Sequence, residues 1–148
     1  MVGKLLIATD GSKFSNKAVD YAMNLAKQLQ CEVIVLYVLN LKHFELYALT
    51  HHDDITGYED EDLKLKKEGE DALSFAIAKG EECGVRMKTR MVRGYPPEQI
   101  MKIAKDDGVD LIVVGNLGKS GIDRILLGSV SEAVVRNAPC PVLVVRGK

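Results

Sequence analysis

The chain has 148 residues, a length that suits one compact domain with a buried core. Hydrophobic residues make up 47% and charged residues 28%, which argues against an intrinsically disordered chain. Its 20 Lys and Arg residues are balanced by 21 Asp and Glu, so it lacks the basic excess expected for a nucleic-acid or anionic-membrane partner. Any bound phosphate must therefore be held locally, by backbone amides and a few side chains.

The N-terminal part of the chain predicts a strand, a turn and a helix. Residues 4–9 form a short apolar run that ends in the turn residues 10–12. Apolar side chains then recur at helical spacing up to Leu29, and Ser12 or Ser15 has the hydroxyl that an N-cap requires.

The middle of the chain predicts a buried strand, a loop, a charged helix and an edge strand. Residues 32–39 are almost continuously apolar, as in a strand covered on both faces. Residues 40–57 lack a clean period and predict a long loop with room for a helical turn. Helical spacing resumes over residues 59–82, where the acidic run 59–62 would favour the helix N-terminus electrostatically. Residues 85–91 alternate apolar and basic side chains, which predicts a strand near a sheet edge.

The C-terminal part continues the alternation. A Gly-Tyr-Pro-Pro turn leads into a helix over residues 98–105, with proline at its start. A buried strand is predicted at 110–114, a glycine-punctuated loop at 115–128, a helix at 129–137 and a last strand at 141–145.

This alternation predicts an α/β fold, an open five-stranded parallel sheet with helices on both faces, formed by a single domain over residues 1–148. In such sheets ligands bind outside the carboxyl ends of the strands, where the strand order reverses. In the order 3-2-1-4-5, strands one and four are neighbours at that point. The turns that follow them, 10–12 and 115–118, would then lie side by side.

The cysteines and the N-terminus favour a cytoplasmic protein. Cys31, Cys83 and Cys140 are odd in number and far apart, and no C-x-x-C pair suggests a disulfide framework, zinc or redox chemistry. The sequence starts without the pattern of a signal peptide, and no apolar run approaches the roughly 18 residues of a membrane span. We therefore expect no membrane partner.

The loop after the fourth strand has the residues that a phosphate site requires. Gly115 and Gly118 would let the backbone approach a phosphate closely or adopt a positive φ, and Gly128 would do the same just before a helix. The N–H groups at that helix start carry the positive end of the helix dipole, and Ser129 and Ser131 add hydroxyl donors.

Residues 113–135, VVGNLGKSGIDRILLGSVSEAVV, resemble the G-x2-G-x9-G-[ST] motif of the ATP-binding branch of the universal stress protein family. Gly115, Gly118, Gly128 and Ser129 occupy the four motif positions. The resemblance extends from LLIATDGS near the start to APCPVLVVRGK at the end. It implies a Rossmann-like fold similar to that of the adenine nucleotide alpha hydrolases.

The resemblance also implies an ATP site. Asp10 would meet the base and ribose, Val38 the adenine through its backbone, and Val114 the nucleoside. Ala8 stands at an adenine contact where ATP-binding relatives often have proline. Mg²⁺ would be held mainly by phosphates and water, since no carboxylate cage is evident. The residues implied around the ribose and phosphates are Gly115, Gly118, Gly128, Ser129, Val130 and Ser131.

Each feature also has a purely structural interpretation. Ser129 and Glu132 have the spacing of a capping box, Asp10 can form an Asx turn, and the glycines can shape a loop. Their combination at the family spacing favours nucleotide binding. A Walker A loop is excluded because Val113 stands where it needs glycine, and the turn after the first strand has too few glycines for a dinucleotide fingerprint.

Other candidate sites are weaker. His51, His52, Asp53 and Asp54 are metal-ligand types, but adjacent residues rarely converge on one ion, so a solvated loop is predicted. The sequence leaves open whether Lys119 and Arg124 contact phosphate or are surface charges.

We therefore expect a binding protein in which ATP biases a dimer or the surface for an unknown protein partner. A slow ATPase is the second interpretation. Efficient hydrolysis is not expected, because no general base is evident near the γ-phosphate. A nucleotide-free interaction protein and a flavin-binding protein are the remaining alternatives. A homodimer is expected through residues 142–145, an apolar strand at a sheet edge, and family members commonly pair through this strand.

Overall fold

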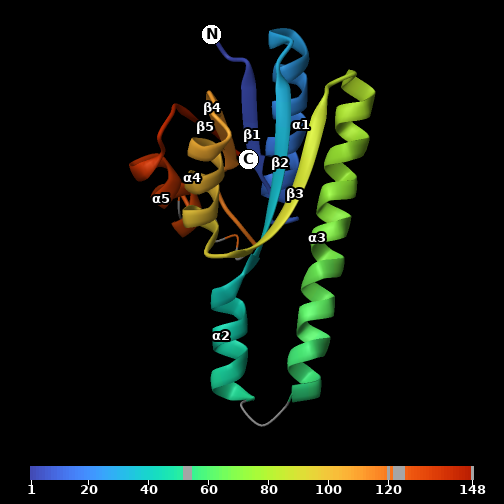
Figure 1. Cartoon of the computed structure of the whole chain (residues 1–148), viewed down its shortest axis with the longest axis vertical. Coiled ribbons are helices and arrows are strands. Elements are labelled where there is room, and N and C mark those ends of the chain that lie inside the picture. The colour runs from blue at the N-terminus through green and yellow to red at the C-terminus, as the bar shows by residue number, and fades with distance from the viewer. Residues whose placement is uncertain (52–54, 120, 122–125, 148) are drawn as a thin grey trace.

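A computed structural model describes residues 1–51, 55–119, 121 and 126–147 of the chain. The expectations for His52, Asp53, Asp54 and Arg124 lie outside them. Helices and strands alternate along the chain, with two consecutive helices after the second strand (Figure 1). In chain order the elements are β1 (Lys4–Ala8), α1 (Lys13–Leu29), β2 (Glu32–Asn40), α2 (Leu41–Thr50), α3 (Ile55–Cys83), β3 (Met87–Gly94), α4 (Pro96–Asp106), β4 (Leu111–Gly115), α5 (Ser129–Asn137) and β5 (Val142–Val145).

The five strands form one parallel sheet in the order β3-β2-β1-β4-β5, which confirms the predicted α/β fold and its order 3-2-1-4-5. Helices α1 and α3 cover one face, and α4 and α5 cover the other (Figure 1). Successive side chains of a strand point to opposite faces, so Leu5 and Ile7 of β1 pack towards α1 while Leu6 packs towards α4. Strands β1 and β4 lie at the centre, and the order reverses between them.

Residues 41–50 form helix α2, where the sequence pattern predicts a loop. Asn40 caps the helix, because its side-chain oxygen accepts a hydrogen bond from the N–H of Lys42 at 3.0 Å. Phe44 is the one residue of α2 that is buried, whereas Leu46 and Leu49 are 56% and 78% exposed. The apolar residues therefore do not share one face, and the helical period is lost.

Helix α3 begins at Ile55, earlier than predicted, and continues to Cys83. Residues 59–62 therefore lie past its first turn, which contains no acidic residue, so their predicted role at the helix N-terminus is wrong. Asp62 instead pairs with Arg93 of β3 at 2.6 Å. The helix is long enough to cross a membrane but carries many charges, and no helix in the described part of the chain is apolar enough to do so.

Helix α2 and the N-terminal half of α3 extend together beyond the carboxyl ends of the strands (Figure 1). We call residues 41–50 and 55–68 the arm. The ring of Phe44 packs against that of Tyr58 at a centroid distance of 5.3 Å, which joins the two helices. The arm therefore stands beside the edge of the sheet at which a ligand crevice is expected.

Two serines that the sequence offers as helix caps behave differently. Ser12 caps α1, and its Oγ accepts a hydrogen bond from the N–H of Ser15 at 3.2 Å. At α5 the N-cap is Gly128, and no side chain caps the helix, so the capping box predicted from Ser129 and Glu132 does not form.

We predict that Ser12→Ala lowers the free energy of unfolding by about 1 kcal/mol, because the first turn of α1 loses its cap. Ser129→Ala should lower it by less than about 0.5 kcal/mol, since no cap is lost there. Urea denaturation of both variants measures the difference. Equal losses would contradict the assignment of the caps.

Candidate functional site

A cavity of about 320 Å³ lies at the carboxyl ends of β1, β2 and β4. Every residue that the sequence analysis places in the nucleotide site lines this cavity. A larger hollow of about 1020 Å³, at the opposite ends of the strands, contains none of them. The residues brought together are Ala8, Asp10, Val38, Val114, Gly115, Gly118, Gly128, Ser129, Val130 and Ser131.

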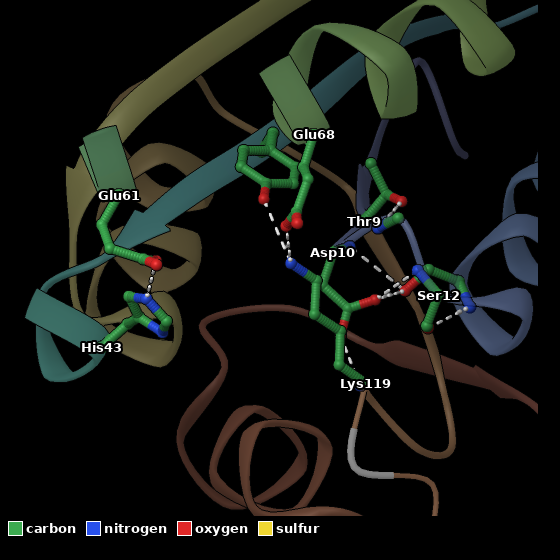
Figure 2. Close-up of polar contacts among 10 residues, drawn as sticks. Thr9, Asp10, Ser12, His43, Glu61, Glu68 and Lys119 are labelled. Atoms are coloured by element: carbon green, nitrogen blue, oxygen red, sulfur yellow. Dashed lines mark hydrogen bonds and ion pairs between the residues drawn. The ribbon is translucent and has the colours of Figure 1, made fainter. Parts of the chain in front are cut away.

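Asp10 joins the two turns that border the cavity (Figure 2). Its Oδ1 accepts hydrogen bonds from the N–H of Ser12 at 2.9 Å and the hydroxyl of Ser15 at 2.8 Å. Its Oδ2 accepts a hydrogen bond from the N–H of Lys119 at 3.0 Å. The expected Asx turn is therefore present, and the same carboxylate also holds the loop that follows β4.

Gly115 and Gly118 permit close approach within the protein and do not adopt a positive φ. A Cβ on Gly115 would lie 2.9 Å from the carbonyl oxygen of Phe14, where the end of β4 meets the start of α1. A Cβ on Gly118 would lie 2.8 Å from Oδ2 of Asp10. The packing of β4 against the backbone of Phe14 therefore requires Gly115, and Gly118 leaves room for the carboxylate of Asp10.

Gly128 is different. It has φ −73° and ψ 171°, which any residue can adopt. A Cβ there would come no closer than 3.6 Å to its nearest neighbours, which is ordinary van der Waals contact. The packing of the described residues therefore does not explain why this position is glycine.

The start of α5 borders the cavity with backbone amides that no acceptor of the helix itself satisfies. The first hydrogen bond of the helix runs from the N–H of Glu132 to the carbonyl of Gly128, so the N–H groups of Ser129, Val130 and Ser131 have no acceptor within the helix. The hydroxyl of Ser131 is buried and donates to the carbonyl of Gly115 at 2.7 Å. Ser131 thus anchors α5 to β4 through its side chain and offers only its amide to the cavity.

Lys119, which the sequence left unassigned, lines the cavity (Figure 2). Its ammonium lies 2.8 Å from Oε2 of Glu68 on α3 and 3.4 Å from the hydroxyl of Tyr37 on β2. Burial raises the pKa of Tyr37, and the nearby lysine only partly offsets this. Burial lowers the pKa of Lys119, but Glu68 and Tyr37 outweigh it and raise that pKa above the ordinary value, so the ammonium is charged at neutral pH.

The sequence analysis missed the residues that the arm contributes. His43 and Leu65 line the cavity, and Nε2 of His43 lies 3.0 Å from Oε2 of Glu61 (Figure 2). This hydrogen bond lowers the pKa of Glu61. His43 falls in the segment predicted as a loop, so nothing in the pattern indicated that it would face the site. Within the described residues, no three metal-ligating side chains gather in one place.

Comparisons with a family model, with sequences and with solved structures all find similarity to universal stress proteins. A sequence model of the universal stress protein family matches residues 1–146. A universal stress protein from Methanocaldococcus jannaschii is 42% identical over 144 residues, which cover 97% of this chain and 81% of that protein. The solved structure of a second protein from that organism is 32% identical, with a TM-score of 0.83 over 100% of this chain and 98% of the other. A universal stress protein solved in complex with cAMP is 27% identical, with a TM-score of 0.70 over 99% of this chain and 98% of the other.

We predict that Gly115→Ala lowers the free energy of unfolding by about 1–3 kcal/mol, because the new Cβ would collide with the backbone of α1. Gly128→Ala is the matched control. It should be neutral or stabilise by up to about 1 kcal/mol, because it meets no close atom and restricts the unfolded chain. Urea denaturation compares the two, and a destabilised Gly128 variant would contradict the geometry.

Proposed function

This chain belongs to the universal stress protein family, and we propose that it acts there as an ATP-binding protein. The nucleotide would lie at the switch point between β1 and β4. The observation that carries this proposal is the convergence of all the predicted site residues on one cavity. The relative in complex with cAMP supports an adenine nucleotide as the class of ligand.

The cavity offers each part of ATP a suitable surface. By the family resemblance, Val38 and Ala8 would meet the adenine and Asp10 the ribose end. The phosphates would lie at the start of α5, where N–H groups without an acceptor in the helix and the positive end of the helix dipole favour an anion. The missing side chain of Gly128 supports this placement, because a ligand would explain a glycine that the packing of the protein does not require.

Mg²⁺ would accompany the phosphates. Among the described lining residues Asp10 is the sole carboxylate, and it already accepts three hydrogen bonds. The lining therefore fits an ion held by phosphate oxygens and water, since Mg²⁺ usually keeps several water ligands.

We infer that binding, and not fast hydrolysis, is the function. Hydrolysis requires a positioned water and stabilisation of the transferring phosphoryl group. The two lining side chains that could act as a base, Asp10 and His43, are engaged by Ser15 and Glu61. A slow ATPase remains the second candidate, because Lys119 could stabilise negative charge on a phosphate.

The protein is expected to bind ATP in the presence of Mg²⁺ and to prefer it to NAD and FMN, as measured by titration calorimetry. Gly128→Val should abolish binding, because its side chain would occupy the space left for the phosphates. Val135→Ala is a control at an exposed position of α5, and this variant should bind ATP as the wild type does.

Tight binding of FMN without ATP would overturn the ligand assignment, and normal ATP binding by the Gly128 variant would overturn the phosphate position. Turnover of many ATP molecules per second by the purified protein would overturn the inference that it only binds.

We also propose a homodimer through β5. This strand pairs with β4 on one side, and its residues Val142–Val145 are all apolar yet partly exposed. A neighbouring groove contains the side chain of Tyr21, which is 52% exposed, beside Val145. Antiparallel pairing of two such edges would satisfy their backbone groups and cover this apolar surface, as a two-fold dimer requires.

We expect Val144→Pro to shift the dimer towards monomer. The carbonyl of Pro141 accepts a hydrogen bond from Ile112 of β4, and that of Val145 accepts one from Asn116, directly after β4. Strand alternation therefore places the N–H of Val144 on the free edge. Thr89→Pro on the opposite edge strand, β3, is the matched control and should stay dimeric. Light scattering at micromolar concentration decides the matter. A monomeric wild type would exclude the dimer, and a dimeric Val144 variant would exclude this interface.

A further inference from the structure

Lys119 is the sole lysine or arginine among the described residues that line the cavity. Its partner in the structure is Glu68, and the side chains of the pair are 47% and 39% exposed. Figure 2 shows the lysine reaching from the loop after β4 to Glu68 on α3, with Asp10 beside it. The positive charge that Lys119 brings to the lining of the cavity is thus neutralised by Glu68.

The position of Lys119 in the loop brings it close to the start of α5. Its backbone N–H is fixed by Asp10, and it directly follows Gly118. The amide nitrogen of Gly118 lies 3.6 Å from where a Cβ on Gly128 would stand, so these two glycines are neighbours. An ammonium on a flexible four-carbon stem can therefore turn from Glu68 to a phosphate chain that extends from α5.

The number of phosphates on the ligand determines whether the movement of the Lys119 side chain from Glu68 to the ligand is favourable. A half-exposed ion pair is weak, so little is lost when Lys119 leaves Glu68. The start of α5 supplies the equivalent of roughly half a positive charge, which suits one phosphate but leaves most of the charge of a triphosphate unmatched. A charged hydrogen bond from Lys119 to the outer phosphates would supply part of the remainder.

We propose that Lys119 determines the preference of the site for a nucleoside triphosphate over a monophosphate. In this proposal Glu68 is a positioning residue, which pairs with Lys119 until the outer phosphates of the ligand replace Glu68 as the partner of the ammonium. This inference rests on the proposed nucleotide site and adds the residues that distinguish a triphosphate from a monophosphate. It also predicts that a triphosphate frees the carboxylate of Glu68 on α3, whereas a monophosphate does not.

Titration calorimetry with ATP, ADP and AMP, on the full chain, tests the proposal. Lys119→Met should lower the affinity for ATP about tenfold and that for AMP less than about twofold, and Lys119→Arg, which keeps the charge, should retain most of the preference. Glu68→Gln should raise the affinity for ATP about threefold, because the competitor for the ammonium is removed.

The double variant Lys119→Met with Glu68→Gln distinguishes competition from a general effect. The gain from Glu68→Gln should vanish when the lysine is absent, since the two residues act as one unit. Lys102 and Asp106 form an ion pair of the same 2.8 Å length that does not line the cavity. Lys102→Met and Asp106→Asn are therefore matched controls and should change the affinity for ATP less than about twofold.

The outcomes separate the two proposals. A wild type that binds neither ATP nor AMP refutes the proposed function and this inference with it. A wild type that binds both, with Lys119→Met lowering the two affinities equally, refutes the inference alone. The inference alone is also refuted if Glu68→Gln raises the affinity for ATP as much in Lys119→Met as in the wild type. It is likewise refuted if Lys119→Arg loses the preference for ATP over AMP as completely as Lys119→Met does.

Discussion

The carboxylate of Asp10 connects three segments that the sheet alone would leave independent. It bonds the turn after β1, the first turn of α1 through Ser15, and the loop after β4 through the N–H of Lys119. Lys119 is 109 residues further along the chain. Because Gly118 has no side chain, the carboxylate fits against the loop. These contacts hold the two central turns of the cavity together, in addition to the pairing of β1 with β4 and the close approach of Gly115 to Phe14.

Contacts of the same kind explain why the residues of the glycine motif also have structural roles. Gly115 lets β4 meet α1, Gly118 makes room for Asp10, and the hydroxyl of Ser131 holds α5 to the end of β4. These positions would be needed even in a protein that binds no ligand. Among the described residues, neither the packing around Gly128 nor the hydrogen bonds within α5 account for that glycine and for the first amides of the helix. Substitutions at these positions are therefore the most direct test of whether the site binds a ligand.

The elements with a clear period, and their order in the sheet, could be predicted from the sequence. Helix α5 matches its predicted range, residues 129–137, and the paired turns at the switch point follow from the strand order. Helix α2 could not be predicted, because it buries only Phe44 and therefore shows no apolar face. The pair between Lys119 and Glu68 joins residues 51 positions apart in elements that no pattern relates. Glu68 lies inside the helix predicted over residues 59–82, but the sequence pattern does not show that this helix passes beside the loop that follows β4.

The long helix α3 links the cavity to the arm through two kinds of contact. Towards its C-terminus, Ala72 and Ala76 are buried against the sheet and α1, and such packing fixes the helix axis. Towards its N-terminus, ion pairs and hydrogen bonds to His43 and Arg93 supply the polar contacts, and these are partly exposed and individually weak. Glu68 is the last residue of the arm, next to the packed part of the helix. Its ion pair with Lys119 therefore joins the loop that follows β4 to α3 at the point where the polar contacts of the arm meet the packing of the core.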